Sequence, residues 1–315
     1  MKKRIFSSGI VVAIIVIAFA SRLITPYIFD GIMGVLAIMG CYEVSKVFKA
    51  ANKPNYTSFA MAFPIVSYIG LIIGMHYQRN YIFFLAYFLI LLLALILAIF
   101  IVGLCDKNNN ERENQEMSLN MTPTRFAFNK AMNTTYLFIY PSLFFFSLSL
   151  LNHIPDLAGF NIASKGLNLF ITFMLIFIFV VTTMTDTFAL LVGMFIGGRK
   201  LCPKISANKT VAGAGGGLFF GTLLGYFLYL IFMTNKTFGQ FFTSIGGKTE
   251  YIILIAIVGS IFTQLGDIWA SLIKRKGNVK DYGNLLPGHG GVMDRVDGLI
   301  VNSLVTTIIV FLLLV

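Results

Sequence analysis

Long stretches without a charged residue constrain this chain more than any other feature of its sequence. Residues 81–104 contain no Lys, Arg, Asp or Glu. A helix of about 20 residues, rising about 1.5 Å per residue, crosses the roughly 30 Å hydrocarbon core of a bilayer. The chain is 57% hydrophobic and only 12% charged, which is more apolar surface than a soluble core of 315 residues buries. The sequence therefore predicts an all-α, polytopic integral membrane protein.

Nine ranges are long and apolar enough to span a bilayer, and the charges between them predict an orientation. Positive residues near the ends of spans stay on the cytoplasmic side. With the N-terminus cytoplasmic and the C-terminus outside, 19 of the 24 Lys and Arg lie inside. The first apolar run resembles a secretory signal, but its length and the lack of a small-residue cleavage site favour a retained span. The predicted spans are 6–26, 31–48, 58–76, 81–104, 134–152, 167–192, 212–233, 251–273 and 298–315.

We expect one integrated membrane domain built from two regions. Residues 1–133 would hold about four spans and a polar cytoplasmic loop near 106–126, and residues 134–315 about five spans with the catalytic part. The net charge of +11 falls mostly on the predicted cytoplasmic side, where anionic lipid headgroups and nucleotides are found. The sequence offers no polar domain to bind nucleic acid. The predicted location is the cell (cytoplasmic) membrane, with the site facing the cytoplasm.

Three isolated features each carry an expectation. Glu43 is an intramembrane carboxylate near the end of its span, where it could belong to a site or pair with Lys46 and Lys49. Pro141 lies inside the fifth span and predicts a kink or an early break. The three cysteines are scattered, without the spacing of a metal site or a disulfide framework.

The segment 264–297 concentrates the polar chemistry of the chain. It holds four of the 13 carboxylates, five of the 24 Lys and Arg, the only Trp and one of the three His. Gln264, Asp267, Ser271 and Lys274 follow one another at helical spacing, which places them within about 80° on one helix face. A polar ladder between helices is the alternative to a functional site here.

After Lys276 the chain leaves the predicted span in a glycine-rich loop. Glycines let the backbone approach a ligand closely, and Asp294 and Asp297 share a face if the next helix has begun. Basic side chains suit phosphate oxygens and acidic ones suit Mg²⁺, so the combination predicts a site for a metal-bound polyphosphate. His289 could act as an acid or base, but phosphoryl transfer depends more on positioning, which favours a role in ligand contact or loop ordering.

Two upstream stretches could complete such a site. Asp186, Gly193 and Gly197 fall within about 40° on one helix face, which favours a packed or water-filled setting for the carboxylate. Residues 199–217 gather hydroxyl, amide and cationic side chains before a Gly-rich helix start, which is the material of a phosphate cradle. Close helix packing is the alternative for both stretches.

The stretch Ser271–Asp297 resembles the signature of the phosphatidate cytidylyltransferases, also called CDP-diacylglycerol synthases. The upstream block is similar as well, but it departs from the family pattern at Ala207, where Pro is usual, and at Ala212, where Glu is usual. Together the similar residues are Asp186, Ser206, Lys209, Thr210, Gln264, Gly266, Asp267, Ser271, Lys274, Arg275, Lys280, Asp281, Gly283, Pro287, His289, Gly290, Gly291, Asp294, Arg295 and Asp297.

The resemblance implies transfer of CMP from CTP to phosphatidate, giving CDP-diacylglycerol and pyrophosphate for phospholipid synthesis. It implies dependence on Mg²⁺, with a second cation and a homodimer as open alternatives. The implied catalytic residues are Asp267, Asp294, Asp297 and Lys274. The implied metal ligands are Asp267, Asp294 and Asp297, with Asp186 as a further candidate. The implied substrate-binding residues are Ser206, Lys209, Thr210, Ser271, Arg275, Lys280, Asp281, His289, Gly290, Gly291 and Arg295.

Two other classes of protein stay open at this point. An ion transporter would place carboxylates near the membrane midplane, whereas the polar residues of this sequence collect near one predicted surface. Another lipid-headgroup enzyme, either a CDP-alcohol phosphotransferase or a polyprenol kinase, is the second alternative. The sequence lacks the acidic DGxxAR-type motif that the first of these enzymes should carry.

Overall fold

The computed structural model describes residues 17–22, 25–77, 81–157, 165–283 and 290–314. It confirms an all-α membrane fold, because seven helices among these residues are long and apolar enough to cross a bilayer. A helix pair bent by 84°, Leu89–Cys105 with Asn110–Glu116, is a candidate eighth span. Eight of the nine predicted ranges fall on long helices, and the first, 6–26, lies mostly outside the described residues.

The chain forms two compact units. The first unit comprises Met1–Phe146 and Ile273–Arg295, and the second comprises Ser147–Leu272 and Val296–Val315. Two long helices, α12 (Thr249–Lys276) and α13 (Met293–Leu314), contribute residues to both units.

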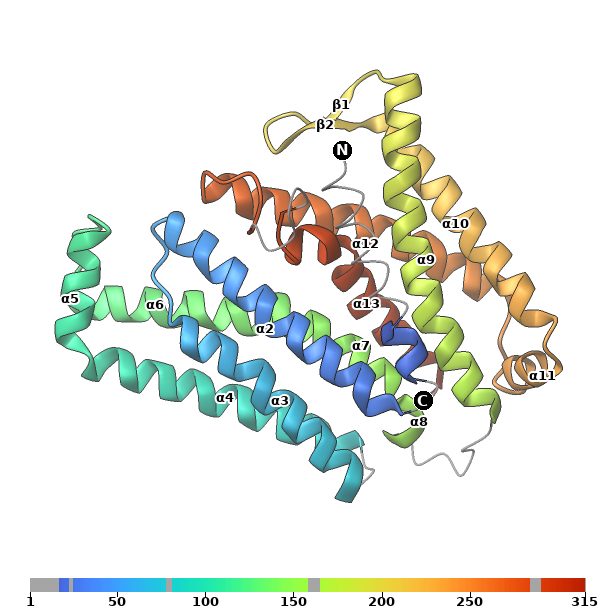
Figure 1. Cartoon of the computed structure of the whole chain (residues 1–315), viewed down its shortest axis with the longest axis horizontal. Helices are drawn as coiled ribbons and strands as arrows, with labels where there is room; N and C mark the ends of the chain where they lie inside the picture. Colours follow the sequence, from blue (N-terminus) through green and yellow to red (C-terminus); the bar gives the residue numbers. More distant parts are fainter. Residues whose placement is uncertain (1–16, 23–24, 78–80, 158–164, 284–289, 315) are drawn as a thin grey trace. The chain divides into compact units, whose positions relative to one another are not determined.

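The core of the first unit lies between α3, α4 and the end of α6 (Figure 1). Phe63, Ile99, Ala131 and Phe138 are buried together, and the Phe63 and Phe138 rings stack with centroids 4.6 Å apart. Helix α2 packs against α3, and α4 packs against α6. The elements are α2 (Pro26–Ala50), α3 (Thr57–Tyr77), α4 (Tyr81–Cys105), α5 (Lys107–Glu116), α6 (Pro123–Leu137) and a π-helical turn η1 (Phe138–Leu143).

The predicted break at Pro141 is confirmed. Tyr140, with φ −117° and ψ 116°, leaves the helical conformation inside η1. A proline in a helix interior removes one backbone hydrogen bond and displaces the preceding turn. The chain continues as α7 (Phe144–Asn152) after this break.

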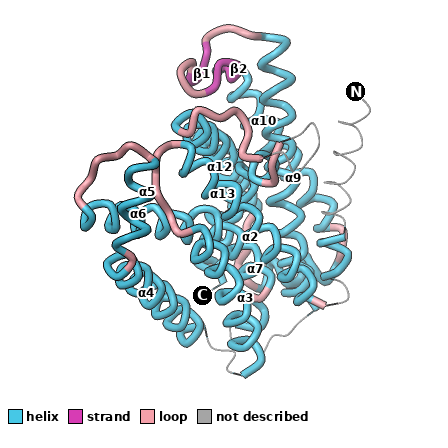
Figure 2. Tube along the Cα trace, turned by 60° about the vertical axis from the view of Figure 1, so that its left-hand side comes forward, coloured by secondary structure: helices cyan, strands magenta, loops and turns pink. Residues whose placement is uncertain are grey.

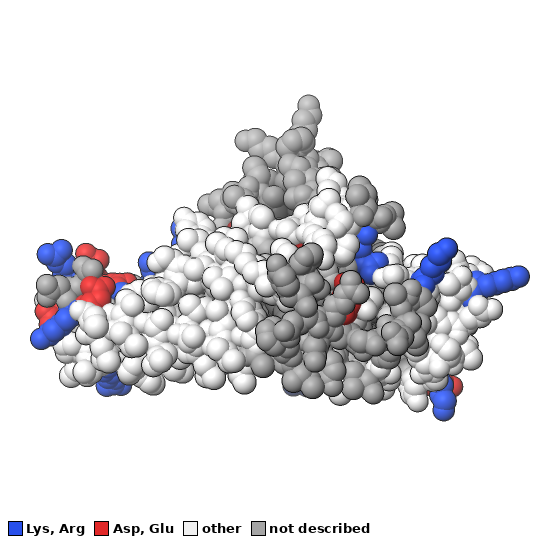
Figure 3. Space-filling model, turned by 90° about the horizontal axis from the view of Figure 1, so that it is seen from below, with Lys and Arg blue, Asp and Glu red and all other residues white. Residues whose placement is uncertain are grey.

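Part of the predicted polar loop near 106–126 is helical, because a buried ammonium group orders it. Lys130 of α6 is 5% exposed and pairs with Glu113 of α5. Its Nζ also lies 4.1 Å from the centroid of the Tyr56 ring. Asn110 is buried and donates a hydrogen bond of 2.7 Å to the Gly103 carbonyl. Figure 3 shows charged side chains gathered at the end where α5 lies, beside wide uncharged surfaces that suit contact with lipid.

In the second unit, α9 and α10 pack along their lengths and are joined by a β-hairpin (Figure 2). The two antiparallel strands pair Lys200 with Thr210 and Cys202 with Ser206. The sequence analysis did not predict these strands. The elements are α8 (Ile154–Leu157), α9 (Lys165–Ile196), β1 (Lys200–Cys202), β2 (Ser206–Thr210), α10 (Val211–Met233) and α11 (Lys236–Ser244).

A stripe of glycines lets α10 approach α9 closely. Gly213, Gly217, Gly221 and Gly225 recur every fourth residue, and all four are buried. A Cβ added at Gly217 would lie 2.7 Å from the carbonyl oxygen of Thr185, which is a backbone atom of α9. Small residues at this spacing are typical of tightly packed membrane helices. The alternative weighed for the Gly-rich stretch, close helix packing, therefore accounts for this face of α10.

We expect Gly217→Ala to lower the free energy of unfolding by about 1–3 kcal/mol, because the backbone of α9 must move to admit the methyl group. Gly215 provides a matched control on the same helix, since an added Cβ there meets nothing within 4 Å. Gly215→Ala should leave the stability unchanged or raise it by up to about 1 kcal/mol, because alanine favours the helix. Denaturation of both variants in detergent measures the difference, and equal stabilities would contradict the close α9–α10 contact.

Candidate functional site

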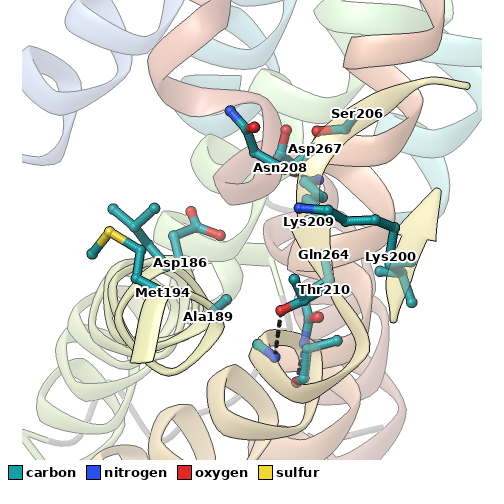
Figure 4. A pocket seen from close by; sticks show the side chains of 15 residues that line it. Asp186, Ala189, Met194, Lys200, Ser206, Asn208, Lys209, Thr210, Gln264 and Asp267 are labelled. Carbon is teal, nitrogen blue, oxygen red and sulfur yellow. Dashed lines mark hydrogen bonds and ion pairs between the residues drawn. The ribbon is translucent and has the colours of Figure 1, made fainter. Parts of the chain in front are cut away.

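The second unit contains a cavity of about 600 Å³ between α9, the β-hairpin, α10 and α12. This volume is typical of sites for small molecules. Figure 4 shows Asp186 of α9 and Lys209 of β2 directed into the cavity from different sides, with Asp267 of α12 close to Lys209. The lining residues are Asp186, Ala189, Leu190, Gly193, Met194, Lys200, Leu201, Ser206, Asn208, Lys209, Thr210, Gly213, Ala214, Gln264 and Asp267.

An ion pair between Lys209 and Asp267 joins the hairpin to α12 within this cavity. Lys209 Nζ lies 2.7 Å from Asp267 Oδ2, although the angle is not that of a hydrogen bond. The two side chains are 23% and 35% exposed overall, while the Lys209 Nζ atom itself is buried beside Asp267. Ser271, one turn further along α12, donates a longer hydrogen bond of 3.4 Å to Asp267 Oδ1.

Two residues of the similar motifs, Thr210 and Gln264, have local structural partners. Thr210 caps α10, since its Oγ1 accepts a hydrogen bond of 3.0 Å from the Gly213 N–H. Gln264 donates from Nε2 to the Ala214 carbonyl at 3.2 Å. A hydroxyl at the start of a helix accepts one of the backbone N–H groups that lack a partner within the helix. These bonds fix the hairpin and the Gly-rich start of α10 beside α12.

Asp267 and Asp297 both lie within electrostatic range of Asp186. The charges of Asp267, Asp297 and Lys209 all act on Asp186. Gly266 permits the approach of α13, because an added Cβ would lie 2.8 Å from the Asp297 carbonyl oxygen. The sequence predicted Asp186 and Asp267 on separate helix faces, and the structure brings both to the same cavity.

The chemistry of these carboxylates suits a hard divalent cation, which prefers oxygen ligands. In the described part of the chain, no three His, Cys, Asp or Glu side chains are grouped closely enough to hold a metal ion by themselves. Mg²⁺ sites in proteins commonly use one or two carboxylates and take the remaining oxygens from substrate phosphates and water. The residues present therefore fit a cation that is bound together with a phosphate ligand.

A second charged cluster lies in the first unit and is centred on Asp294. Lys274 Nζ donates to Asp294 Oδ1 at 2.6 Å, and the side chains are only 11% and 6% exposed. Asp294 Oδ2 accepts hydrogen bonds from the backbone N–H groups of Tyr282, at 2.8 Å, and Gly291, at 2.9 Å. The Tyr282 ring also faces the ammonium, with 5.2 Å between Nζ and the ring centroid. Both oxygens of Asp294 are thus engaged within the protein.

The other predicted site residues are distributed around these two clusters. Four charged site residues predicted in the segment 264–297 are exposed, and His289 lies outside the described residues. Gly290 adopts φ +84°, a conformation that favours glycine, directly before the turn that leads to Asp294. The four exposed residues are Arg275, Lys280, Asp281 and Arg295.

Sequence reasoning missed two contributions and left a third, that of Glu43, open between a site residue and a local ion pair. Lys200 lines the cavity from β1, and only its position after the double glycine could have indicated it. Tyr282 acts on Asp294 through its backbone N–H, which no side-chain pattern reveals. Glu43 pairs with backbone N–H groups at the start of α13, besides lying near the charge of Lys46.

The fold and these clusters define a helical membrane protein that carries Lys–Asp pairs and a charged cavity on its long helices. Residues 2–313 match the model of the Cytidylyltransferase family. The chain therefore belongs to the cytidylyltransferase family.

Several relatives named phosphatidate cytidylyltransferase align with part of the chain. The protein of Bacillus subtilis strain 168 is 42% identical over 118 residues, which are 38% of this chain and 40% of the relative. A protein of Staphylococcus epidermidis is 41% identical over 123 residues, or 39% and 43% of the two chains. The protein of Rickettsia conorii is 37% identical over 128 residues, which are 41% of this chain and 52% of the relative. The aligned part thus spans about half the length of these relatives or less.

We expect Lys274→Met to lower the free energy of unfolding by about 3 kcal/mol, because it leaves the buried Asp294 carboxylate without its cation. Lys276, exposed on the same helix, provides the control, and Lys276→Met should change the stability by no more than about 0.5 kcal/mol. The double variant Lys274→Met/Asp294→Asn should lose less than the sum of the single losses. Additive losses in denaturation experiments would show that the two side chains do not act as a pair.

Proposed function

We propose that the chain transfers CMP from CTP to phosphatidate, forming CDP-diacylglycerol and pyrophosphate for phospholipid synthesis. Membership of the cytidylyltransferase family and the names of the aligned relatives support this reaction. The observation that carries the proposal is the Lys209–Asp267 pair at 2.7 Å, which joins the two motif-bearing stretches at a cavity large enough for a small-molecule substrate.

The proposed reaction is a phosphoryl-group displacement. An oxygen of the phosphatidate monoester attacks the α-phosphorus of CTP and forms a new P–O–P bond. The bond between the α- and β-phosphates breaks, and its electron pair leaves with pyrophosphate. Such chemistry needs the reactants to be positioned in line and their charge to be neutralised, which cationic and metal-binding side chains can provide.

For the second unit, we assign Lys209 to phosphate oxygens and Asp267 with Asp297 to the divalent cation. Asp186 lies within electrostatic range of all three and serves as a further oxygen donor. A bound Mg²⁺ would neutralise charge on the departing pyrophosphate. Ser206, on the wall of the same cavity, can donate a hydrogen bond to a phosphate oxygen.

For the first unit, we assign Lys274 to phosphate binding and Asp294 to holding Lys274. Both Asp294 oxygens already accept hydrogen bonds, from Lys274 and from two backbone N–H groups. A direct bond from Asp294 to a cation would have to displace one of these partners. The exposed Arg275, Lys280 and Arg295 add positive charge that attracts anionic substrates.

A lipid substrate is supported by the apolar wall of the cavity. Leu190 and Met194 of α9 line it and are 61% and 63% exposed. Exposed side chains of this kind on a membrane helix suit contact with acyl chains, while Lys209 and Asp267 suit a headgroup. We place this end of the cavity at the cytoplasmic side of the cell membrane, where CTP is available, in agreement with the bias of Lys and Arg.

Purified protein incubated with labelled CTP, Mg²⁺ and phosphatidate vesicles tests the function. We expect labelled CDP-diacylglycerol and one pyrophosphate for each product molecule. Omission of phosphatidate or addition of a chelator should stop product formation. The absence of liponucleotide under every metal condition would remove the proposed function.

Asp267→Asn should lower the rate of product formation at least about 100-fold and raise the Mg²⁺ concentration for half-maximal activity about tenfold or more, because loss of a metal ligand costs both binding and rate. Glu250 is an exposed carboxylate at the start of the same helix, and Glu250→Gln should retain wild-type values. Initial rates over a Mg²⁺ titration measure both effects. Unchanged metal dependence in Asp267→Asn would remove Asp267 from the metal site.

Asp294→Asn should lower kcat about 10- to 100-fold, while the Mg²⁺ concentration for half-maximal activity stays within about twofold, because Asp294 acts through Lys274. The same titration applied to this variant separates positioning of Lys274 from metal binding. A large rise in the Mg²⁺ requirement would instead make Asp294 a metal ligand, as the family resemblance implies.

A further inference from the structure

Glu43 is a buried carboxylate on α2 that belongs to none of the motifs described above. It is 6% exposed. Its Oε1 accepts a hydrogen bond of 2.9 Å from the Val292 N–H, and its Oε2 accepts one of 2.9 Å from the Met293 N–H. Met293 is the first residue of α13. The first N–H groups of a helix have no partner within the helix, so Glu43 caps α13 from a distant part of the chain.

The backbone of the turn before α13 lies directly on this carboxylate. A Cβ added at Gly291 would lie 2.4 Å from Glu43 Oε2, and one added at Gly283 would lie 2.9 Å from Oε1. Any other residue at Gly291 would therefore push the turn away from Glu43. The glycine at this position permits close approach to a carboxylate of the protein itself.

Asp294 also binds this turn, through the backbone N–H of Gly291. Its Oδ2 accepts the Gly291 N–H, so three successive N–H groups, from Gly291 to Met293, are divided between Asp294 and Glu43. Asp294 Oδ1 in turn accepts the ammonium of Lys274. The position of Lys274 thus depends on a chain of charge-assisted hydrogen bonds that begins at Glu43.

We propose that Glu43 is a positioning residue for the reaction, which holds the turn Gly291–Asp294 and thereby Lys274 in the arrangement that the substrates need. This inference rests on the proposed function. Glu43 accepts hydrogen bonds from the Val292 and Met293 N–H groups and would act on the reaction through Asp294 and Lys274. Groups that orient the residues of a site are commonly worth 10- to 100-fold in activity when they are removed.

A purely structural role for Glu43 makes a different prediction. Val292 is 7% exposed and Met293 fully buried, so loss of their acceptor leaves two N–H groups without water. If the loss of the Glu43 carboxylate affected only folding, the activity of a sample would fall in proportion to its folded fraction. A positioning role lowers the activity of the folded protein and loosens residues 290–294 in particular.

Two variants of similar size separate these roles. Glu43→Gln keeps one acceptor oxygen but sets an amide donor against a backbone N–H, whereas Glu43→Met keeps neither acceptor. Ser45→Ala is the matched control: Ser45 is a fully buried polar residue of α2 that bonds to Asn55 at 2.6 Å and to Thr57 at 2.7 Å. The Ser45→Ala variant loses buried hydrogen bonds of α2, and none of the lost bonds involves the turn Gly291–Asp294.

The experiment measures kcat/KM for each folded variant and amide hydrogen exchange of peptides covering residues 290–294. We expect Glu43→Gln to lose about 10- to 100-fold in kcat/KM and Glu43→Met to lose more, both with faster exchange in these peptides. Ser45→Ala should keep both values within about twofold of wild type. If Glu43→Met does not fold, Glu43→Gln alone decides the question.

Wild-type rates and wild-type exchange in a Glu43 variant would overturn the proposal, and so would slow catalysis without faster exchange at residues 290–294. An equal response in Ser45→Ala would also overturn it, because the effect would then belong to α2 in general. Failure of the proposed function looks different: the wild-type protein itself would form no CDP-diacylglycerol, whatever the exchange measurement shows.

Discussion

A charge inside an apolar protein must be neutralised or fully hydrogen-bonded, and this requirement organises the polar parts of the chain. In the second unit, Lys209 neutralises Asp267 between the hairpin and α12. In the first unit, Asp294 combines Lys274 with two backbone N–H groups. Each of these pairings joins separate segments of the chain. The atoms proposed to serve phosphate chemistry are therefore also atoms that hold the free protein together.

The two clusters differ in the exposure of their side chains and in the number of their partners. The Lys209 and Asp267 side chains are 23% and 35% exposed, whereas Lys274 and Asp294 are 11% and 6% exposed. A phosphate could replace the carboxylate at Lys209 and leave Asp267 for a cation, with little change in the total charge of the cavity. The Lys274–Asp294 pair is held by more partners and is suited to keep one fixed geometry.

Local periodicity predicted most of the fold and part of the site. Uncharged runs located the long helices, and the spacing of Gln264, Asp267 and Ser271 correctly placed them on one helix, α12. The partners of these residues could not be predicted in the same way, because Lys209 and Ala214 reach α12 from the hairpin and α10. The polar segment that includes Asn110 was expected to be a loop. Its helical order depends on contacts with Lys130 of the next helix, so its own composition could not reveal that order.

The same limit explains why the family was easier to predict than the support of the site. Motif residues are close together in sequence, so Ser271–Asp297 carried the family resemblance without any tertiary information. Glu43 lies outside the motif, and its acceptors are directed at backbone N–H groups that have no residue-specific pattern. The sequence supported only a general choice between a site residue and a local ion pair with Lys46 and Lys49. The hydrogen bonds to Val292 and Met293 show a third arrangement.

The contact between Glu43 and Val292 joins residues 249 positions apart, which has a consequence for how the protein is made. Chains are synthesised from the N-terminus, and their early segments fold while later ones are still on the ribosome. The Glu43 carboxylate on α2 therefore lacks these two backbone donors until the start of α13 has been synthesised. The turn that carries Asp294 is completed only near the end of synthesis, so an unfinished chain in the membrane cannot present a completed turn.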